Sequence, residues 1–157
     1  MMILRDQKGF SIAELLVVIT IIGILALIVI PTWLAYGPAA TIAGAAREVQ
    51  AGLNQARQLA ISTRQNVCVR VVPPRGYQFM VGVAGGCAGG AAWTGLNTDG
   101  TGIFWLANQG VTIAAPPLNP VFTPFGTAAQ VAVFTVTGPQ ARQQTVTVSP
   151  SGRVTIP

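Results

Sequence analysis

The sequence predicts an α+β fold in which one long N-terminal helix packs on a head of short antiparallel strands. Three observations predict it: an apolar run at residues 10–30, apolar residues at helical spacing that continue to about residue 63, and short β-branched runs punctuated by glycine and proline. We therefore divide the 157 residues into a short N-terminal segment (1–9), an apolar helix of membrane-spanning length (10–31), a breaker segment with an amphipathic helix (32–64) and a β-rich head (65–157).

The composition is too apolar for an ordinary soluble domain of this length. Hydrophobic residues make up 51% of the chain and the mean hydropathy is +0.57, which indicates a membrane or a large assembly. The chain has no histidine, and its acids are Asp6, Glu14, Glu48 and Asp99. These counts exclude a Ser-His-Asp arrangement and a histidine-based metal site. We therefore expect no enzyme activity, no metal and no cofactor.

The apolar run is long enough to cross a bilayer once. Residues 15–30 carry no charge, and extension back to Phe10 gives 21 positions interrupted only by Glu14. A helix of that length spans about 32 Å, against a hydrocarbon core of about 30 Å. Two basic residues precede the run, whereas the next one is Arg47. The positive-inside bias therefore predicts a cytoplasmic N-terminus and an exported head.

Three interpretations of this run compete. A cleavable secretory signal has an apolar core of about 7–15 residues, and this run is longer and begins with a glutamate. A plain signal anchor explains everything except Glu14 and the Gly9-Phe10 junction. A carboxylate costs about 2.5–3.5 kcal/mol on membrane-insertion scales, and less near the interface. Glu14 is therefore a functional candidate, and the third interpretation gives it a role.

Residues 8–18, KGFSIAELLVV, with an apolar run that ends at Pro31, resemble the N-terminus of a type IV prepilin or pseudopilin. The resemblance implies that residues 1–9 are a prepilin leader and that the helix at residues 10–31 serves first as a membrane anchor and later as part of a filament core. It further implies that a prepilin peptidase cleaves after Gly9 on the cytoplasmic side of the inner membrane and methylates the new amine of Phe10. It also implies that Glu14, the fifth residue of the mature chain, pairs with the N-terminal amine of a neighbouring pilin subunit in the filament.

Such a pairing of Glu14 is also reasonable on electrostatic grounds. Cleavage after Gly9 creates a positive amine at the edge of an apolar helix. A buried charge without a partner is costly, and a paired one costs much less. Glu14 lies about one helical turn from Phe10 of its own chain, so an intrachain and an interchain pair both stay open. Interchain pairing is the hypothesis for assembly.

Breakers divide the long helix into two halves. Pro31 removes a backbone donor and Gly37-Pro38 follows, so we expect the helix to end or kink here. In related filaments the segment between such breakers can unwind during assembly. From residue 39 to about 63 helix formers return, with an apolar stripe that we expect to pack on a sheet. The stripe consists of Ile42, Ala46, Val49, Leu53, Ala56 and Ala60.

Short runs beyond residue 65 predict a sheet with one buried face. Residues 73–76 and 149–152 have turn composition and predict the first and last hairpins. Eight glycines in residues 82–102 predict a long surface loop. The expected strands are 66–72, 77–83, 103–106, 111–114, 121–125, 131–137, 145–149 and 153–156.

Cys68 and Cys87 are the only cysteines, and the predicted topology places both outside the cytoplasm. A bridge between them would contribute about 3 kcal/mol in the chain-entropy model. We expect a disulfide that ties the first strand to the glycine-rich loop, with two free thiols as the alternative.

The C-terminal run from residue 134 to 154 resembles the end of the GspH/FimT family of minor pseudopilins. Members of that family place a long helix against two β-sheets of short strands, which is a pilin-like fold. The resemblance implies a minor subunit of a type II secretion pseudopilus or of a type IV pilus. The work of such a subunit is assembly with other pilin or pseudopilin subunits.

The alternative function is DNA binding in a natural-transformation pilus. Some members of the family bind DNA through a C-terminal Gly-Arg-X-Arg segment, and here residues 152–155 read GRVT, without the second arginine. After Gly37 the chain has seven arginines against two acids, a surface that attracts polyanions. Arg142 and Arg153 are the candidate DNA contacts if the last strands bring them together. Otherwise the arginines are solvated or pair with other subunits.

Overall fold

The computed structural model describes residues 11–157, with only the backbone described for residues 31–35. The chain forms two compact units, and the boundary between them falls between Gly37 and Pro38. The described part of the first unit consists of Ser11 and the helical residues 12–37. The second unit, Pro38–Pro157, contains the rest of the helix and all the strands.

Helix α1 (Ile12–Thr63) begins at a serine cap and includes 52 residues. The Oγ of Ser11 accepts a hydrogen bond from the backbone N–H of Ala13 at 3.3 Å. The helix continues through Pro31 and Gly37-Pro38, so the expected end at these breakers is wrong, and the alternative, a kink there, stays a prediction. A proline removes one hydrogen bond from the helical ladder, and the long helical runs on both sides maintain the others.

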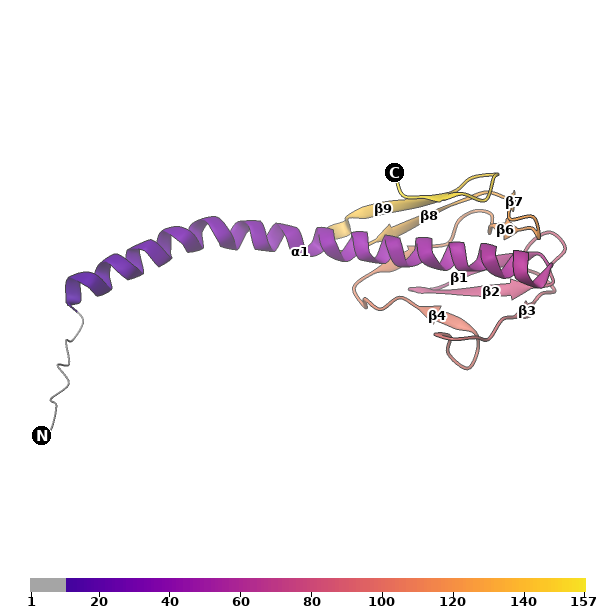
Figure 1. Cartoon of the computed structure of the whole chain (residues 1–157), viewed down its shortest axis with the longest axis horizontal. Helices are drawn as coiled ribbons and strands as arrows, with labels where there is room; N and C mark the ends of the chain where they lie inside the picture. Colours follow the sequence, from indigo (N-terminus) through magenta and orange to yellow (C-terminus); the bar gives the residue numbers. More distant parts are fainter. Residues whose placement is uncertain (1–10) are drawn as a thin grey trace, which may run out of the picture. The chain divides into compact units, whose positions relative to one another are not determined.

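The part of α1 in the second unit buries the predicted apolar stripe. Every member of the stripe, from Ile42 to Ala60, is at most 6% exposed, and Ala45 is buried beside them. These side chains share one hydrophobic cluster with residues of the strands. The predicted packing of this helical face on a sheet is confirmed. Figure 1 shows this part of α1 lying along the strands of the head.

Two antiparallel sheets form the rest of the second unit (Figure 1). The first has the order β3-β2-β1-β6-β7, with β4 also paired to β2, and the second has the order β10-β9-β8-β5. A short 3-10 helix, η1 (Pro139–Ala141), connects β8 to β9. The strands are β1 (Val67–Val72), β2 (Gly76–Val81), β3 (Ala91–Ala92), β4 (Ile103–Trp105), β5 (Thr112–Ala114), β6 (Val121–Phe122), β7 (Ala128–Gln130), β8 (Ala132–Thr137), β9 (Gln143–Val148) and β10 (Val154–Thr155).

This arrangement confirms the predicted α+β fold. All eight expected strands are present, most of them shorter than expected. The first hairpin pairs Val72 with Gly76 and the last pairs Val148 with Val154, as the turn composition predicts. Strands β3 and β7 are additional, and β3 lies inside the segment expected to be a loop. Both consist of residues with little strand preference, so the pairing depends on their neighbours in the sheet.

Aromatic rings fill the space between the helix and the first sheet. Phe79 is fully buried and its ring centroid lies 4.6 Å from that of Phe104. Tyr77 stacks on Phe104 at 5.2 Å, and Trp93 stacks on it at 6.0 Å. Trp93 therefore serves as part of the core and holds the glycine-rich segment to it.

Candidate functional site

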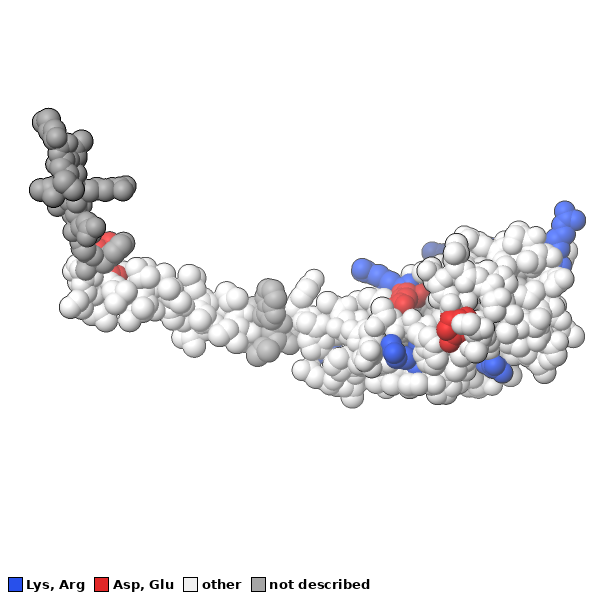
Figure 2. All heavy atoms as spheres, turned by 90° about the horizontal axis from the view of Figure 1, so that it is seen from below, with Lys and Arg blue, Asp and Glu red and all other residues white. Residues whose placement is uncertain are grey.

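The first unit exposes apolar side chains on every side of its helix. The segment Ile12–Ile30 is by length and composition able to cross a membrane once. Its large apolar side chains are between 46% and 80% exposed, with no buried face. Figure 2 shows this stretch without Lys or Arg side chains. A surface of this kind needs cover, either from lipid or from other protein chains.

Glu14 lies in the first turn of α1 and is the only charged residue within Ile12–Ile30. Its side chain is exposed, and its backbone N–H donates to the carbonyl of Ser11 at 3.1 Å. The positive end of the helix dipole favours an anion at this position. Gly9 and Phe10 lie outside the described residues. Pro31 is helical, and its role in assembly stays a prediction.

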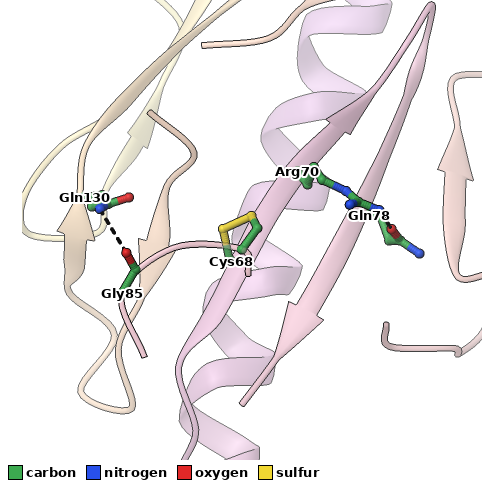
Figure 3. Close-up of a disulfide and its surroundings, with 6 residues drawn as sticks. Cys68, Arg70, Gln78, Gly85 and Gln130 are labelled. Atoms are coloured by element: carbon green, nitrogen blue, oxygen red, sulfur yellow. Dashed lines mark hydrogen bonds between the residues drawn. A yellow bond between two sulfur atoms is a disulfide. The ribbon is translucent and has the colours of Figure 1, made fainter. Parts of the chain in front are cut away.

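A disulfide joins Cys68 in β1 to Cys87 in the glycine-rich segment, with the Cα atoms 5.2 Å apart (Figure 3). Cys68 is fully buried beside Val83 and Val121. Next to the disulfide, the side-chain amide of Gln130 in β7 donates to the carbonyl of Gly85 at 3.4 Å. The bridge therefore fixes one end of the glycine-rich segment to the first sheet.

Asp99 organises the other end of the same segment. One carboxylate oxygen accepts hydrogen bonds from the backbone and hydroxyl of Thr101, at 2.9 and 2.6 Å, and from the backbone of Ile103 at 2.9 Å. The other accepts from the indole N–H of Trp105 at 2.9 Å. These bonds, led by that of the Thr101 hydroxyl, hold the pKa of Asp99 well below its ordinary value. The segment is thus anchored at both ends.

Arg142 and Arg153 lie at opposite ends of β9, so the expectation that the last strands bring them together is wrong. Arg153 is opposite Ser149, whose backbone N–H donates to its carbonyl at 2.9 Å. Arg142 directly precedes Gln143, the first residue of β9. At about 3.3 Å per residue, the seven steps from residue 142 to 149 cover about 23 Å. The register of the hairpin explains the separation.

Other arginines of the second unit donate hydrogen bonds within the chain. Arg57 and Arg75 bind backbone carbonyls, at 2.7 and 2.6 Å. Arg70 donates to the side-chain oxygen of Gln78 at 2.7 Å (Figure 3). Structural roles thus account for these three, and the DNA-binding alternative has no support.

A polar hollow beside α1 contains residues that do not stand out in the sequence. The carboxylate of Glu48 accepts the backbone N–H of Ala107, with its two oxygens at 3.2 and 3.4 Å. The phenol of Tyr77 lies against the backbone of Gly52, one turn further along the helix. A glycine among the buried helical positions is the one signal that points to such a close approach.

Two family models match the chain. Residues 4–30 match the prokaryotic N-terminal methylation motif, and residues 45–152 match the type II transport protein GspH. The second match covers more than half of the chain. A comparison with curated proteins finds no match.

Solved structures with the same fold include two minor subunits. The chain is similar to the type IV minor pilin FimU of Pseudomonas aeruginosa, with 20% identity and a TM-score of 0.55, over 76% of this chain and 90% of that chain. It is also similar to the minor pseudopilin EpsH from the type 2 secretion system of Vibrio cholerae, with 18% identity and a TM-score of 0.51, over 71% of this chain and 92% of that chain.

These likenesses confirm the pilin-like fold, and the match to the GspH model confirms the resemblance seen in the C-terminal residues. The chain belongs to the family of the type II transport protein GspH, and the solved structures that share its fold include a type IV minor pilin and a minor pseudopilin.

Proposed function

We propose that the chain is made as a precursor, cleaved between Gly9 and Phe10 by a prepilin peptidase and N-methylated at Phe10. The match of residues 4–30 to the methylation motif supports this processing. Cleavage leaves a mature chain of 148 residues whose first residue is an apolar aromatic with a free amine. The mature helix then starts at the edge of the apolar surface, and nothing charged except its amine and Glu14 precedes residue 31.

Before assembly, the helix holds the protein in the inner membrane with a cytoplasmic N-terminus and a periplasmic head. The 19 residues Ile12–Ile30 span about 28 Å, close to the thickness of the hydrocarbon core. The charge asymmetry around the run supports the orientation. A disulfide in the head suits an oxidising compartment.

Assembly then exchanges lipid around the helix for helices of other subunits, and Glu14 fixes their relative position. The observation that carries this proposal is a single exposed carboxylate in the first turn of an otherwise uncharged apolar helix. Apolar contacts alone tolerate sliding of one helix along another. One pair between Glu14 and the Phe10 amine of a neighbour favours one axial register, because a slip separates two charges in an apolar medium.

Glu14→Gln and Glu14→Asp variants of the full-length precursor test the proposal. Incubation with a prepilin peptidase should remove nine residues from the wild type and from both variants, as measured by mass spectrometry. Glu14→Gln should then be nearly absent from sheared filaments, whereas Glu14→Asp, which keeps the charge, should be incorporated in part. Normal incorporation of Glu14→Gln would exclude the charge pair. A wild-type precursor that keeps its first nine residues would exclude the processing.

Pro31 is also proposed to serve assembly. Because proline donates no backbone hydrogen bond, the helix near residue 31 loses fewer bonds than elsewhere when it unwinds. Pro31→Ala should leave cleavage unchanged and lower incorporation into filaments. Incorporation equal to that of the wild type would remove Pro31 from the assembly mechanism.

A further inference from the structure

A hollow of about 280 Å³ lies in the second unit, between α1 and the first sheet. Ligand pockets for small molecules and cofactors usually have volumes of about 300–1,000 Å³, so this hollow lies just below that range. Its lining combines one carboxylate, two amides and three aromatic rings. These side chains are Glu48, Gln55, Tyr77, Asn97, Phe104 and Trp105.

Glu48 supplies a fixed negative charge to the hollow. Its carboxylate is held by the backbone N–H of Ala107, which lies 3.2 and 3.4 Å from the two oxygens. Within the described part of the chain, no Lys or Arg nitrogen pairs with it. A half-buried carboxylate with free lone pairs attracts a cation that can donate hydrogen bonds.

Tyr77 and Gly52 shape the wall next to this carboxylate. A Cβ atom at Gly52 would lie 2.7 Å from Cε2 of Tyr77, so only glycine leaves room for the ring here. Gly52 is four residues after Glu48 and lies on the same side of α1. Burial, with a smaller effect from the charge of Glu48, raises the pKa of Tyr77 to about 12. The phenol therefore stays a neutral hydroxyl that can donate or accept.

The aromatic rim favours a planar cation. Trp105 is 42% exposed, and the guanidinium carbon of Arg75 in the same chain lies 5.9 Å from its ring centroid. Arg75 therefore already occupies one approach to the ring, and a second guanidinium can contact only the exposed part of Trp105 that lines the hollow. Leu96 precedes the lining residue Asn97 and is 87% exposed. An anionic hollow with exposed apolar side chains beside it has the composition of a contact site for another protein.

We infer that this hollow binds an arginine side chain from a neighbouring subunit of the filament. A guanidinium pairs with a carboxylate and stacks on aromatic rings, whereas an ammonium does so less well. The charges of the second unit agree with this inference, because the hollow contains a carboxylate whereas the unit as a whole has an excess of arginine. Arg64, Arg142 and Arg153 are exposed, so copies of this chain present the required group. The identity of the occupant rests on the proposed assembly into filaments.

The chemistry of the hollow can be tested on the isolated mature protein in detergent micelles. Arginine amide and citrulline amide, both N-acetylated so that neither has a charged α-amine, have nearly the same shape, and only the first is a cation. In NMR titrations of isotope-labelled protein, arginine amide should shift the indole N–H signal of Trp105 in a saturable way, and citrulline amide should not. Glu48→Gln should weaken the binding about tenfold, because a charge-assisted hydrogen bond is lost.

Two arginine insertions provide matched controls. Ala51 is exposed and lines the hollow, so Ala51→Arg should fill it and abolish the response to arginine amide. Ala88→Arg adds the same charge at an exposed position of the glycine-rich segment and should leave the response unchanged. Equal responses to the two probes, or an unchanged affinity in Glu48→Gln, would overturn the assignment of the hollow.

Filament incorporation tests the occupant separately. Glu48→Gln should be cleaved normally and should be incorporated several-fold less than the wild type. If the hollow binds arginine amide but Glu48→Gln assembles normally, the occupant is not a filament subunit, and this part of the inference is wrong. Failure of the proposed assembly through Glu14 would leave the probe titration unaffected, so the two failures are distinguishable.

Discussion

Arg57 on α1 donates a hydrogen bond from its Nε to the carbonyl oxygen of Gly126, 2.7 Å away. Gly126 lies in the turn between β6 and β7, where its N–H donates to Thr123 at 2.9 Å. A Cβ atom at Gly152, in the turn between β9 and β10, would overlap the same Gly126 carbonyl. One arginine of the helix thus contacts the place where turns of both sheets meet. The relationship predicts how the head responds to changes at these positions.

Arg57→Ala should lower the free energy of unfolding by about 1–2 kcal/mol, because a hydrogen bond from a charged donor is lost at a partly buried site. Denaturant titration of the mature protein in detergent, followed by tryptophan fluorescence, measures the change. Arg47 is exposed on the same helix, and Arg47→Ala should change stability by less than about 0.5 kcal/mol. Equal losses in the two variants would show that the bond to Gly126 contributes nothing.

Gly152→Ala and Gly44→Ala should have opposite effects. Gly152 has a φ of +77° and no space for a Cβ atom, so alanine there should cost at least about 1–2 kcal/mol. Gly44 is exposed in the middle of α1 with open space around it, so alanine there should add about 0.5–1 kcal/mol. The same denaturant titration tests both. A stabilising Gly152→Ala would contradict the close approach of the two turns.

Replacement of Cys68 and Cys87 by alanine should lower stability by about 3 kcal/mol, because the unfolded chain is no longer cross-linked. Limited proteolysis should also cleave the glycine-rich segment faster, since one of its two anchors is gone. Mass spectrometry of non-reduced peptides from the wild type is the control, and it should show the two cysteines in one linked peptide pair. If the double variant is as stable as the wild type, the disulfide does not stabilise the protein.

Asp99 should make the glycine-rich segment sensitive to acid. Its pKa is lowered in the folded protein from the ordinary value of 3.8. The ionised carboxylate therefore stabilises the folded segment fully above pH 3.8, and this stabilisation is lost as the pH falls from 3.8 through the lowered pKa of Asp99. The indole N–H signal of Trp105 should shift as the carboxylate is protonated. Asp99→Asn should remove this shift of the indole signal. If the shift persists in Asp99→Asn, another titrating group causes it.

Most of the fold predictions that the structure confirms depend on local patterns in the sequence. The stripe from Ile42 to Ala60 and the hairpin turns depend on spacing and turn residues, which are visible in the chain itself. Strand β3 depends instead on the pairing of Ala91 with Val81, and nothing in two alanines indicates that partner. Helix α1 continues through Pro31, so a proline inside a long helix does not by itself determine where the helix ends.

Some residues of the candidate sites can be identified from the sequence, and others only from the fold. Glu14 stands out because it is a lone charge in an apolar run, so sequence alone identifies it. Glu48 and Tyr77 come from a helix and a strand, and their meeting depends on the fold and on the missing side chain of Gly52. The separation of Arg142 from Arg153 depends on hairpin register, which composition does not determine.

The uniformly apolar surface of Ile12–Ile30 has a consequence for energy transfer during assembly. Lipid tails and neighbouring helices are almost equally apolar, so the hydrophobic effect contributes little to moving this helix from one to the other. In the proposed function, the direction of the exchange therefore depends on packing between helices and on the Glu14 pair, and not on the burial of apolar surface.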